Sequence, residues 1–298
     1  DITPEVPAMI GSSAALAVSN IPWNGPTGTV VVGCVDGQYV INPTEAQREK
    51  STMHVYVSGT KDAVLMVEAG AEEVSEEEML GAILFAHEEI KKIVEFIESI
   101  VKEIGKEKVT VPLVATGDDI KQAVREFAYD KCVWCFDTTV RKERQEREAQ
   151  VKQECKEHFA EQFEGRMSEV ADALYYLNKE VMRRKILDQG IRADGRGLTE
   201  VRPIWCEVGV LPRTHGSAIF TRGETQAMTV TTLGSMSDVQ MLDGLGTEDF
   251  KRYIHHYNMP PYATGEAGRM KSPGRREIGH GALAERALLP VIPGEDEF

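Results

Sequence analysis

The stretch of sequence that decides the fold runs from Ser75 to Gly105 and reads SEEEMLGAILFAHEEIKKIVEFIESIVKEIG. Ser75 with Glu78 three residues later is a capping box, in which each side chain accepts a hydrogen bond from the backbone N–H of the other residue. Apolar residues then recur every three or four positions from Met79 to Ile104, and Gly105 is a typical helix end. This pattern predicts one long amphipathic helix with a single apolar face.

Valine-rich runs precede this helix. Residues 28–34, 53–57 and 63–67 have the composition of strands, and Pro and Gly mark the turns between them. Strands followed by a long amphipathic helix indicate a layered α+β unit, which we place at residues 1–105.

The composition changes twice after the long helix. From Asp118 the chain is almost free of Gly and Pro, is dense in charged residues and has apolar residues at helical spacing. Residues 106–188 are therefore predicted to form a small all-helical domain. Residues 189–298 return to the strand-and-turn pattern and end in a helix from about Arg275 to Pro290. The predicted strands of this last section are residues 204–210, 217–220 and 228–233. The predicted fold class is thus α+β, with two such units flanking a helical connector.

Composition and charge exclude several classes of protein. The chain has 298 residues and a formal net charge of −14, and no apolar run approaches the roughly 18 to 20 residues of a membrane span. Its five cysteines are an odd number spread over a long chain, which favours a reducing, cytoplasmic location. The net charge argues against indiscriminate binding of nucleic acid. A local basic set nevertheless occurs between residues 251 and 276, comprising Lys251, Arg252, Arg269, Lys271, Arg275 and Arg276.

Five motifs carry a family resemblance. They are GIRADGR at residues 190–196, GVLPRTHGSAIFTRGETQ at 209–226, LG at 233–234, HYNMPPY at 256–262 and RREIGHG at 275–281. In this order they closely resemble the start of the second core domain of the bacterial polynucleotide phosphorylases. The strands and long helix before them resemble the back half of the first core domain, and the helical section matches the family's connector in position and character.

The resemblance covers essentially the whole chain and implies both a fold and an activity. The fold would be two partial RNase PH-like domains joined by the all-helical domain at residues 106–188. Residues 1–105 would be the C-terminal half of the first and residues 189–298 the N-terminal half of the second. The activity would be that of a phosphorolytic 3′-to-5′ exoribonuclease, a polyribonucleotide nucleotidyltransferase that acts in mRNA degradation and releases nucleoside diphosphates. A non-catalytic RNA-binding or ring-scaffold member of the same fold is the alternative.

Arg275 and Arg276 are the leading candidates for substrate binding. An arginine side chain donates two parallel hydrogen bonds to phosphate oxygens and keeps its charge, and the free N–H groups at a helix start also favour anions. The resemblance implies that this catalytic pair contacts the RNA backbone and the attacking phosphate. A surface salt bridge of the pair with Glu277 or Glu285 is the alternative.

Four further residues near the arginine pair are candidates. His280 lies about one helical turn later, and the resemblance implies a catalytic role for it in the active-site cleft, with a packing role as the alternative. Tyr257 and Tyr262 belong to a Pro-rich loop and are predicted either to stack RNA bases or to pack in the core. Lys271 is predicted to contact RNA from the basic run.

Two other sets of polar residues look functional but are assigned to structure. Arg213, His215, Arg222 and Glu224 lie on strand-and-turn motifs, so a role in the sheet or in a subunit contact is favoured over catalysis. The other set has the spacing of a zinc site with two ligand pairs and comprises Cys132, Cys135, Cys155 and His158. Core packing is favoured there and no metal site is predicted in this chain, although a helical zinc module is a third interpretation.

The resemblance also implies groups and partners beyond this sequence. The family uses Mg²⁺ or Mn²⁺, held by aspartates that this sequence does not contain, as well as a phosphate-binding serine loop. Inorganic phosphate is the co-substrate, and the partners would be single-stranded RNA, the other subunits of a homotrimer and RNA degradosome components, with no membrane. The 298-residue chain alone is expected to be inactive and to leave sheet edges open and apolar faces uncovered.

Overall fold

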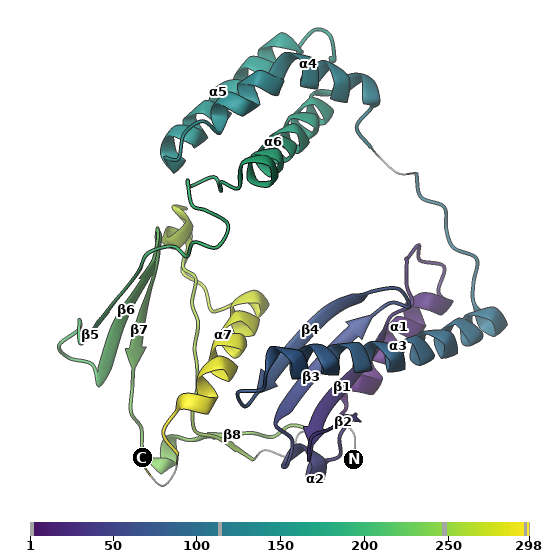
Figure 1. Cartoon of the computed structure of the whole chain (residues 1–298), viewed down its shortest axis with the longest axis vertical. Coiled ribbons are helices and arrows are strands. Elements are labelled where there is room, and N and C mark those ends of the chain that lie inside the picture. Colours follow the sequence, from purple (N-terminus) through teal and green to yellow (C-terminus); the bar gives the residue numbers. More distant parts are fainter. Residues whose placement is uncertain (1–2, 113–114, 246–248, 295–296, 298) are drawn as a thin grey trace. The chain divides into compact units, whose positions relative to one another are not determined.

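The computed structural model describes residues 3–112, 115–245, 249–294 and 297, and its elements are labelled in Figure 1. Backbone contacts divide the chain into two compact units. The first comprises Asp1–Val111 together with Gly234–Phe298, and the second comprises Pro112–Leu233. The last part of the chain therefore belongs to the same unit as the first part.

The first unit contains a four-stranded antiparallel sheet with the strand order β2-β1-β3-β4. The three predicted strands are confirmed as β1 (Gly28–Val35), β3 (Met53–Gly59) and β4 (Val64–Ala71). The sequence prediction missed β2 (Gln38–Ile41), which is only four residues long. It pairs with β1 through a two-residue turn in which Asp36 and Gly37 both have positive φ angles, 51° and 76°, as tight hairpins require.

The long predicted helix is confirmed as α3 (Glu76–Ile104). Its capping box forms as expected: the Glu78 N–H donates to Ser75 Oγ at 3.2 Å and the Ser75 N–H donates to Glu78 Oε2 at 3.0 Å. The helix packs on β1 and β3 and buries one face against their valines. The fully buried residues on that face are Ala82, Ala86, Ile90, Val94 and Ile97. This layer of helix on sheet is the α+β core that the sequence predicted.

Helix α1 (Glu5–Val18) packs against α3 and β1, and a short helix α2 (Glu45–Arg48) follows β2. Lys108, beyond the end of α3, caps the end of α1. Its ammonium group donates to the carbonyl oxygens of Leu16, Ala17 and Ser19 at 3.0, 2.9 and 2.6 Å. A cation at the C-terminal end of a helix is favourable because the last carbonyl groups have no partner within the helix.

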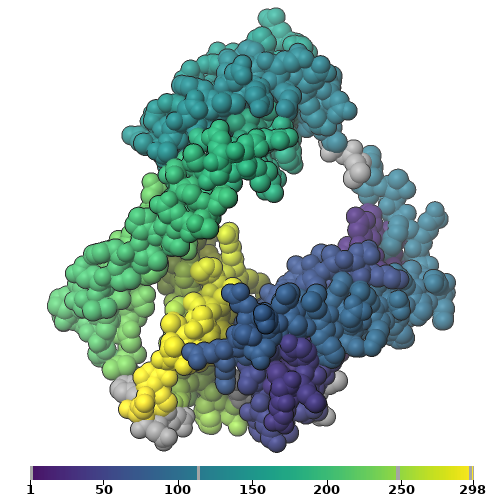
Figure 2. All heavy atoms as spheres, viewed as in Figure 1, coloured from purple at the N-terminus to yellow at the C-terminus, as the bar shows by residue number. Residues whose placement is uncertain are grey.

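The second unit begins with the predicted all-helical section, which forms a bundle of α4 (Asp118–Cys135), α5 (Arg141–His158) and α6 (Met167–Gln189). Its side chains fill a continuous core, and the space-filling view shows the three helices as a closely packed body (Figure 2). Ile120, Val124, Val151 and Phe159 are at most 2% exposed. The apolar residues at helical spacing in this section are thus buried by the other helices of the same section.

Arg166 ties the start of α6 to the start of α4. Its guanidinium group pairs with Glu169 at 2.8 Å and with Asp119 at 3.0 Å. The Gly117 N–H also donates to Glu169 Oε2 at 3.1 Å. Together the Arg166 and Gly117 hydrogen bonds lower the pKa of Glu169 to about 2, so this carboxylate stays ionised in the folded protein.

The second unit also contains an antiparallel sheet of β5 (Ile204–Val208), β6 (Gly216–Arg222) and β7 (Thr225–Thr231), with β6 in the centre. Large apolar side chains remain exposed along these strands, and the 80% exposed Val208 is the extreme case. The others are Ile204, Trp205, Phe220, Met228 and Val230. The predicted uncovered apolar sheet is confirmed here.

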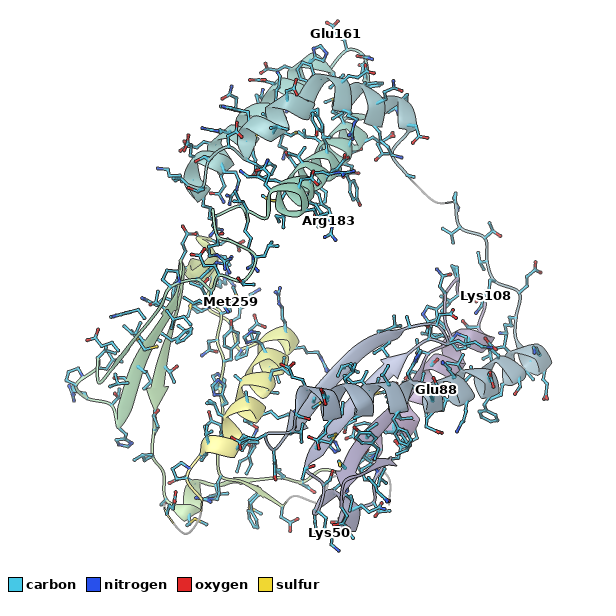
Figure 3. The ribbon with its side chains drawn as sticks, viewed as in Figure 1. Lys50, Glu88, Lys108, Glu161, Arg183 and Met259 are labelled. Atoms are coloured by element: carbon cyan, nitrogen blue, oxygen red, sulfur yellow. The ribbon has the colours of Figure 1, made fainter. Side chains whose placement is uncertain are left out.

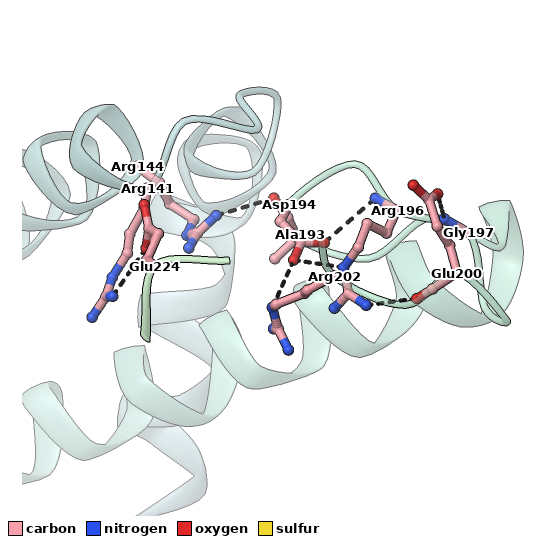
Figure 4. Close-up of polar contacts among 9 residues, drawn as sticks. All are labelled: Arg141, Arg144, Ala193, Asp194, Arg196, Gly197, Glu200, Arg202 and Glu224. Carbon is pink, nitrogen blue, oxygen red and sulfur yellow. Dashed lines mark hydrogen bonds and ion pairs between the residues drawn. The ribbon is translucent and has the colours of Figure 1, made fainter. Parts of the chain in front are cut away.

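A compact segment of polar contacts joins α6 to β5 (Figure 4). Asp194 pairs with Arg196 at 2.9 Å and with Arg202 at 3.4 Å, and the Arg196 hydrogen bond lowers the pKa of Asp194. Two residues of α5 reach this region. Arg144 donates to the Ala193 carbonyl at 3.1 Å, and Arg141 pairs with Glu224 in the turn between β6 and β7 at 3.2 Å.

The returning part of the first unit holds the strand pair β8 (Gln240–Met241) and β9 (Phe250–Lys251) and the closing helix α7 (Arg275–Leu288). The predicted helix from about Arg275 is confirmed. Arg286 of α7 pairs with Glu68 of β4 at 2.6 Å. Its aliphatic part lies over Gly70, where a Cβ atom would come within 3.1 Å of Arg286 Cδ.

None of the described helices has the length and the apolar composition that crossing a membrane requires.

Candidate functional site

The arginine pair occupies the first two positions of α7. Gly274 precedes it in an extended conformation and offers no side chain to cap the helix. The first backbone bond within the helix is donated by Ile278 to the Gly274 carbonyl at 3.0 Å. The N–H groups of the first turn are therefore left for an external acceptor, and the positive end of the helix dipole adds to the two guanidinium charges.

Both arginines are exposed and have no ion pair or hydrogen bond with the part of the chain that the structure describes. The alternative salt bridge to Glu285 does not form, because that carboxylate is already held. Lys251 pairs with Glu285 at 2.7 Å, and the His255 N–H donates to it at 3.1 Å. Glu277 also forms no ion pair with either arginine among the described residues. With respect to the described residues, Arg275 and Arg276 thus present two unpaired cations beside free N–H groups.

An extended segment positions α7 from the side. Along residues 251–257 every second residue is half-buried, namely Lys251, Tyr253, His255 and Tyr257. The Tyr253 hydroxyl and His255 Nδ1 share a 2.8 Å hydrogen bond, and burial together with the charge of Glu285 raises the pKa of Tyr253. The amino-acid types do not reveal this alternation, because Lys251 and His255 are polar and half-buried while Ile254 is exposed. Nothing in the sequence therefore indicated the Glu285 network that the segment forms with α7.

The structure brings together two of the predicted site residues. The rings of Tyr257 and His280 lie with centroids 4.5 Å apart and planes inclined by 31°. Gly281 makes this approach possible because it is buried, and a Cβ atom there would lie 3.2 Å from Tyr257 Cβ. Tyr257 therefore packs on His280 at a half-buried position rather than in the core, while His280 itself stays exposed one turn behind the arginines.

The remaining predicted RNA contacts lie on the loop that precedes α7. Tyr262, in a short 3-10 helix (Pro261–Thr264), is 73% exposed, and Lys271 is exposed as well. Neither touches the arginine pair or His280 through any hydrogen bond, ion pair or ring contact within the described residues. An exposed tyrosine contradicts the core-packing alternative for Tyr262.

The strand-and-turn candidates behave partly as structural residues. His215 Nδ1 accepts a 2.8 Å hydrogen bond from the Leu233 N–H, and Glu224 pairs with Arg141. Arg213 and Arg222 are exposed. His215 therefore joins the start of β6 to the chain just after β7, whereas the exposed Glu224 forms a surface ion pair.

The zinc interpretation has no geometric support. Cys132, Cys135 and Cys155 are all buried in the bundle core, and the His158 ring stacks on Phe127 at 4.0 Å. Burial raises the pKa of Cys132 to about 12 and those of Cys135 and Cys155 to about 11, so the metal-binding thiolate is disfavoured. In the described ranges no three His, Cys, Asp or Glu residues are placed to hold a metal ion.

Three family models match the chain in the order that the motifs suggested. "3' exoribonuclease family, domain 2" matches residues 25–89, "Polyribonucleotide nucleotidyltransferase, RNA binding domain" matches residues 119–197, and "3' exoribonuclease family, domain 1" matches residues 200–298. A second half of one exoribonuclease domain thus precedes a first half of another, with the helical bundle between them. The predicted pair of RNase PH-like sections around a helical domain is confirmed.

Curated proteins that are similar to this chain match its sequence over its entire length. A polyribonucleotide nucleotidyltransferase of Clostridioides difficile is 58% identical over 301 residues, which cover 100% of this chain and 43% of that protein. Proteins of the same name from Caldicellulosiruptor saccharolyticus and Ruminiclostridium cellulolyticum are 56% and 53% identical, again over 100% of this chain and 42% of theirs. The chain thus spans less than half the length of these curated relatives. Its sequence and its three matched sections place it in the polyribonucleotide nucleotidyltransferase family.

Proposed function

We propose that this chain supplies the RNA- and phosphate-binding wall of a phosphorolytic 3′-to-5′ exoribonuclease acting in mRNA degradation. The observation that supports the proposal is the pair of exposed guanidinium groups of Arg275 and Arg276 at the open start of α7, which have no ion pair with any residue that the structure describes. Such a site suits two anions held close together, the terminal phosphodiester and the attacking phosphate.

In the proposed reaction, an oxygen of inorganic phosphate attacks the phosphorus of the 3′-terminal phosphodiester. The new P–O bond forms as the bond to the 3′-oxygen of the preceding nucleotide breaks, and that oxygen takes up a proton. The products are a nucleoside diphosphate and an RNA shorter by one nucleotide, and the reverse reaction extends RNA. Arg275 and Arg276 would stabilise the negative charge that gathers between the two phosphates.

His280 and Tyr257 would bound the site behind the arginines. Because Tyr257 supports the His280 ring, the imidazole can hydrogen-bond to a phosphate or to the terminal ribose in a fixed orientation. Tyr262 and Lys271 on the preceding loop would contact the RNA further from the reacting bond, by stacking and by charge.

The proposed enzyme also uses Mg²⁺ or Mn²⁺, which would neutralise charge on the phosphates. The residues around α7 do not fit such an ion. Glu285 is occupied by Lys251, and the described residues contain no acidic cluster placed for a metal. We therefore propose that the metal ligands lie outside the described residues, and we expect the 298-residue chain alone to be inactive.

The proposed partners are single-stranded RNA and two further subunits of a homotrimer in the cytoplasm, with RNA degradosome components as additional partners. RNA binding is supported by the match of residues 119–197 to a model described as an RNA binding domain. A subunit contact is supported by the exposed apolar residues of β5, β6 and β7, since large uncovered patches of this kind mark interaction surfaces.

The test is the double substitution Arg275→Ala/Arg276→Ala in the full-length protein. Loss of two charged donors to the reacting phosphates should reduce phosphate-dependent shortening of labelled oligoadenylate by at least about 10²-fold to 10³-fold. Release of nucleoside diphosphate measures the rate, and gel filtration measures assembly.

The matched control removes two charges elsewhere. Lys152→Ala/Lys156→Ala acts on the exposed face of α5 and should leave the rate unchanged. Normal phosphorolysis by the arginine variant would refute the proposed site. An unmodified protein that binds RNA but never shortens it would instead indicate the non-catalytic, scaffold alternative.

A further inference from the structure

Helix α6 presents two adjacent aromatic side chains to solvent. Tyr175 and Tyr176 are 64% and 61% exposed, and their rings meet edge to face with centroids 5.4 Å apart. The opposite face of the helix supplies Leu174, Leu177 and Val181 to the bundle core. The two tyrosines therefore do not pack in the bundle core, although each has a large apolar ring.

Cations continue this surface along the helix. Lys179 lies four residues after Tyr175, and Arg183 lies seven residues after Tyr176, so both fall on the tyrosine side of α6. Both are exposed, and Arg183 projects from the helix on the side opposite α5 (Figure 3). Neither forms an ion pair with the described part of the chain. Asp172, one turn before Tyr176, is the acidic residue that limits the surface at its N-terminal end.

A fixed pair extends the surface onto α4. Arg125 binds Glu180 with two hydrogen bonds of 2.7 and 2.9 Å, and its guanidinium carbon lies 5.2 Å from the centre of the Tyr129 ring. The only acidic side chain between Lys179 and Arg183 is thus already neutralised. Tyr129 is 37% exposed and adds a third ring.

The exposed charges of α5 differ from those of α6. On α5, Arg147 pairs with Glu143 at 2.5 Å, and Glu154 accepts hydrogen bonds from Gln150 and from Lys131. Lys152 and Lys156 of α5 are also exposed without an ion pair among the described residues, but α5 has no tyrosine, phenylalanine or tryptophan beside them. On α6 the exposed Tyr175 and Tyr176 lie on the same side of the helix as Lys179 and Arg183, so this face combines rings with charge and α5 does not.

We propose that Tyr129, Tyr175, Tyr176, Lys179 and Arg183, the tyrosine strip, form a second binding surface for single-stranded RNA. Exposed rings stack on bases of any sequence, and the cations contact the backbone between them. The proposal rests on RNA being the substrate, as proposed above, and assigns a contact to residues other than the arginine pair of α7. In a chain with a net charge of −14, such a strip attracts RNA only at short range.

The test compares RNAs of two lengths on the full-length protein. Fluorescence anisotropy measures binding of oligoadenylates of about 8 and about 30 nucleotides, and phosphorolysis of the shorter RNA is measured in parallel. Tyr175→Ala/Tyr176→Ala should weaken binding of the longer RNA by about 5-fold to 160-fold or more, since loss of even one stacked base costs about 1 to 3 kcal/mol. Binding and phosphorolysis of the shorter RNA should stay unchanged.

Two further variants separate the contributions of rings and charges. Tyr175→Phe/Tyr176→Phe keeps the rings and should bind like the unmodified protein. Lys179→Ala/Arg183→Ala should reduce the slope of log affinity against log salt concentration by about 1 to 2. The matched controls are Phe96→Ala, which removes a 64% exposed ring from α3, and Lys152→Ala/Lys156→Ala on α5.

Unchanged affinity of the tyrosine variant for the longer RNA would overturn the proposal, and so would an equal loss in the controls. A change in subunit assembly without a change in RNA affinity would show a protein contact instead. Ultraviolet crosslinking of the unmodified protein to the longer RNA needs no substitution, and absence of crosslinks at α6 would also overturn it. Failure of the α7 test above would leave these binding results independent, because they do not measure phosphorolysis.

Discussion

The helical bundle and the three-stranded sheet of the second unit are chain neighbours with opposite states of packing. In the bundle, helices α4, α5 and α6 close a core in which Ile120 and Val124 are completely buried. In the sheet, β5 and β7 are exposed at every position along their length. A bundle of consecutive helices buries its own apolar faces against one another. A sheet instead needs a second layer to cover its apolar face, and three strands alone do not supply that layer.

This difference bears on how each region contributes to function. The closed bundle needs nothing more for stability, so exposed features of its surface, such as the tyrosine strip, are free for binding. The open sheet needs a cover, so its exposed apolar residues are first of all candidates for burial by other protein.

The strongest prediction contrasts one phenylalanine from each region in the 298-residue chain. Phe159→Ala should lower the free energy of unfolding by about 3 to 5 kcal/mol, because a cavity replaces a side chain that is 2% exposed. Phe220→Ala, at a position 45% exposed, should cost less than about 1 kcal/mol. Urea denaturation followed by circular dichroism measures both. Equal losses would contradict the contrast, and a larger cost of Phe220→Ala in the full-length protein would show that the sheet is covered there.

The thiols provide a second contrast. Cys206 on β5 is exposed and should react with a thiol reagent at pH 8, while Cys132, Cys135 and Cys155 should react only after unfolding. Labelled peptides identified by mass spectrometry measure this, with labelling in denaturant as the control. Rapid labelling of Cys132 in the folded protein would show that the bundle opens readily.

The same thiols predict a loss of bundle stability at alkaline pH. Burial raises the pKa of Cys132 from 9.0 to about 12, so the folded state keeps the proton. Above pH 9 the unfolded state alone loses it, so the stability present below pH 9 declines as the pH rises toward 12. Denaturant midpoints between pH 8 and pH 11 measure this, and Cys132→Ala should reduce the slope.

A smaller effect is expected at acid pH. Arg166 and Gly117 hold the pKa of Glu169 at about 2, below its ordinary value of 4.5. The stabilisation is present above pH 4.5 and is lost as the pH falls toward 2, because the unfolded state takes up the proton first. Glu169→Gln should flatten the acid limb of the midpoint curve, while Glu161→Gln, an exposed control, should not. Identical curves for the two variants would contradict this assignment.

The smallest effect concerns the ion pair that links the two regions. Arg141 and Glu224 lie 3.2 Å apart with side chains 62% and 71% exposed, so their coupling should be only about 0 to 0.5 kcal/mol. A double-mutant cycle of Arg141→Ala and Glu224→Ala, measured by urea denaturation, gives this number. Coupling above about 1.5 kcal/mol would show that the pair fixes the sheet to the bundle.

Sequence reasoning predicted most of the fold because most elements have a strong local signal. The capping box at Ser75, the periodicity of the bundle and the valine-rich strands each correspond to an observed element. The four-residue strand β2 was missed because it is too short for a pattern and is held mainly by its partner β1. The cysteine spacing of the bundle was ambiguous, since helical periodicity places core thiols and metal ligands at the same intervals.

The exposed arginine pair of the candidate site was predictable from the sequence, but the residues that support α7 and His280 were not. Arg275 and Arg276 lie at a helix start that the sequence indicates directly. The Lys251–Glu285 pair and the packing of Tyr257 on His280 join residues far apart in the chain, so no local pattern reveals the partners. Residues 251–257 have no alternation of apolar and polar types, since Ile254 is exposed and Lys251 is half-buried, so the half-buried side of this segment was not predictable either.

The ion pair between Arg286 and Glu68 has a consequence for the order of folding. It joins residues separated by 218 positions, and the intervening chain includes the complete bundle. On an emerging polypeptide, β4 and the bundle can form while α7 is still inside the ribosome. The helix that carries Arg275 and Arg276 can be anchored to β4 only after its own last turn has been made, because contacts of long sequence separation form late. Binding competence should thus appear at the end of synthesis of this stretch, well after the bundle has folded.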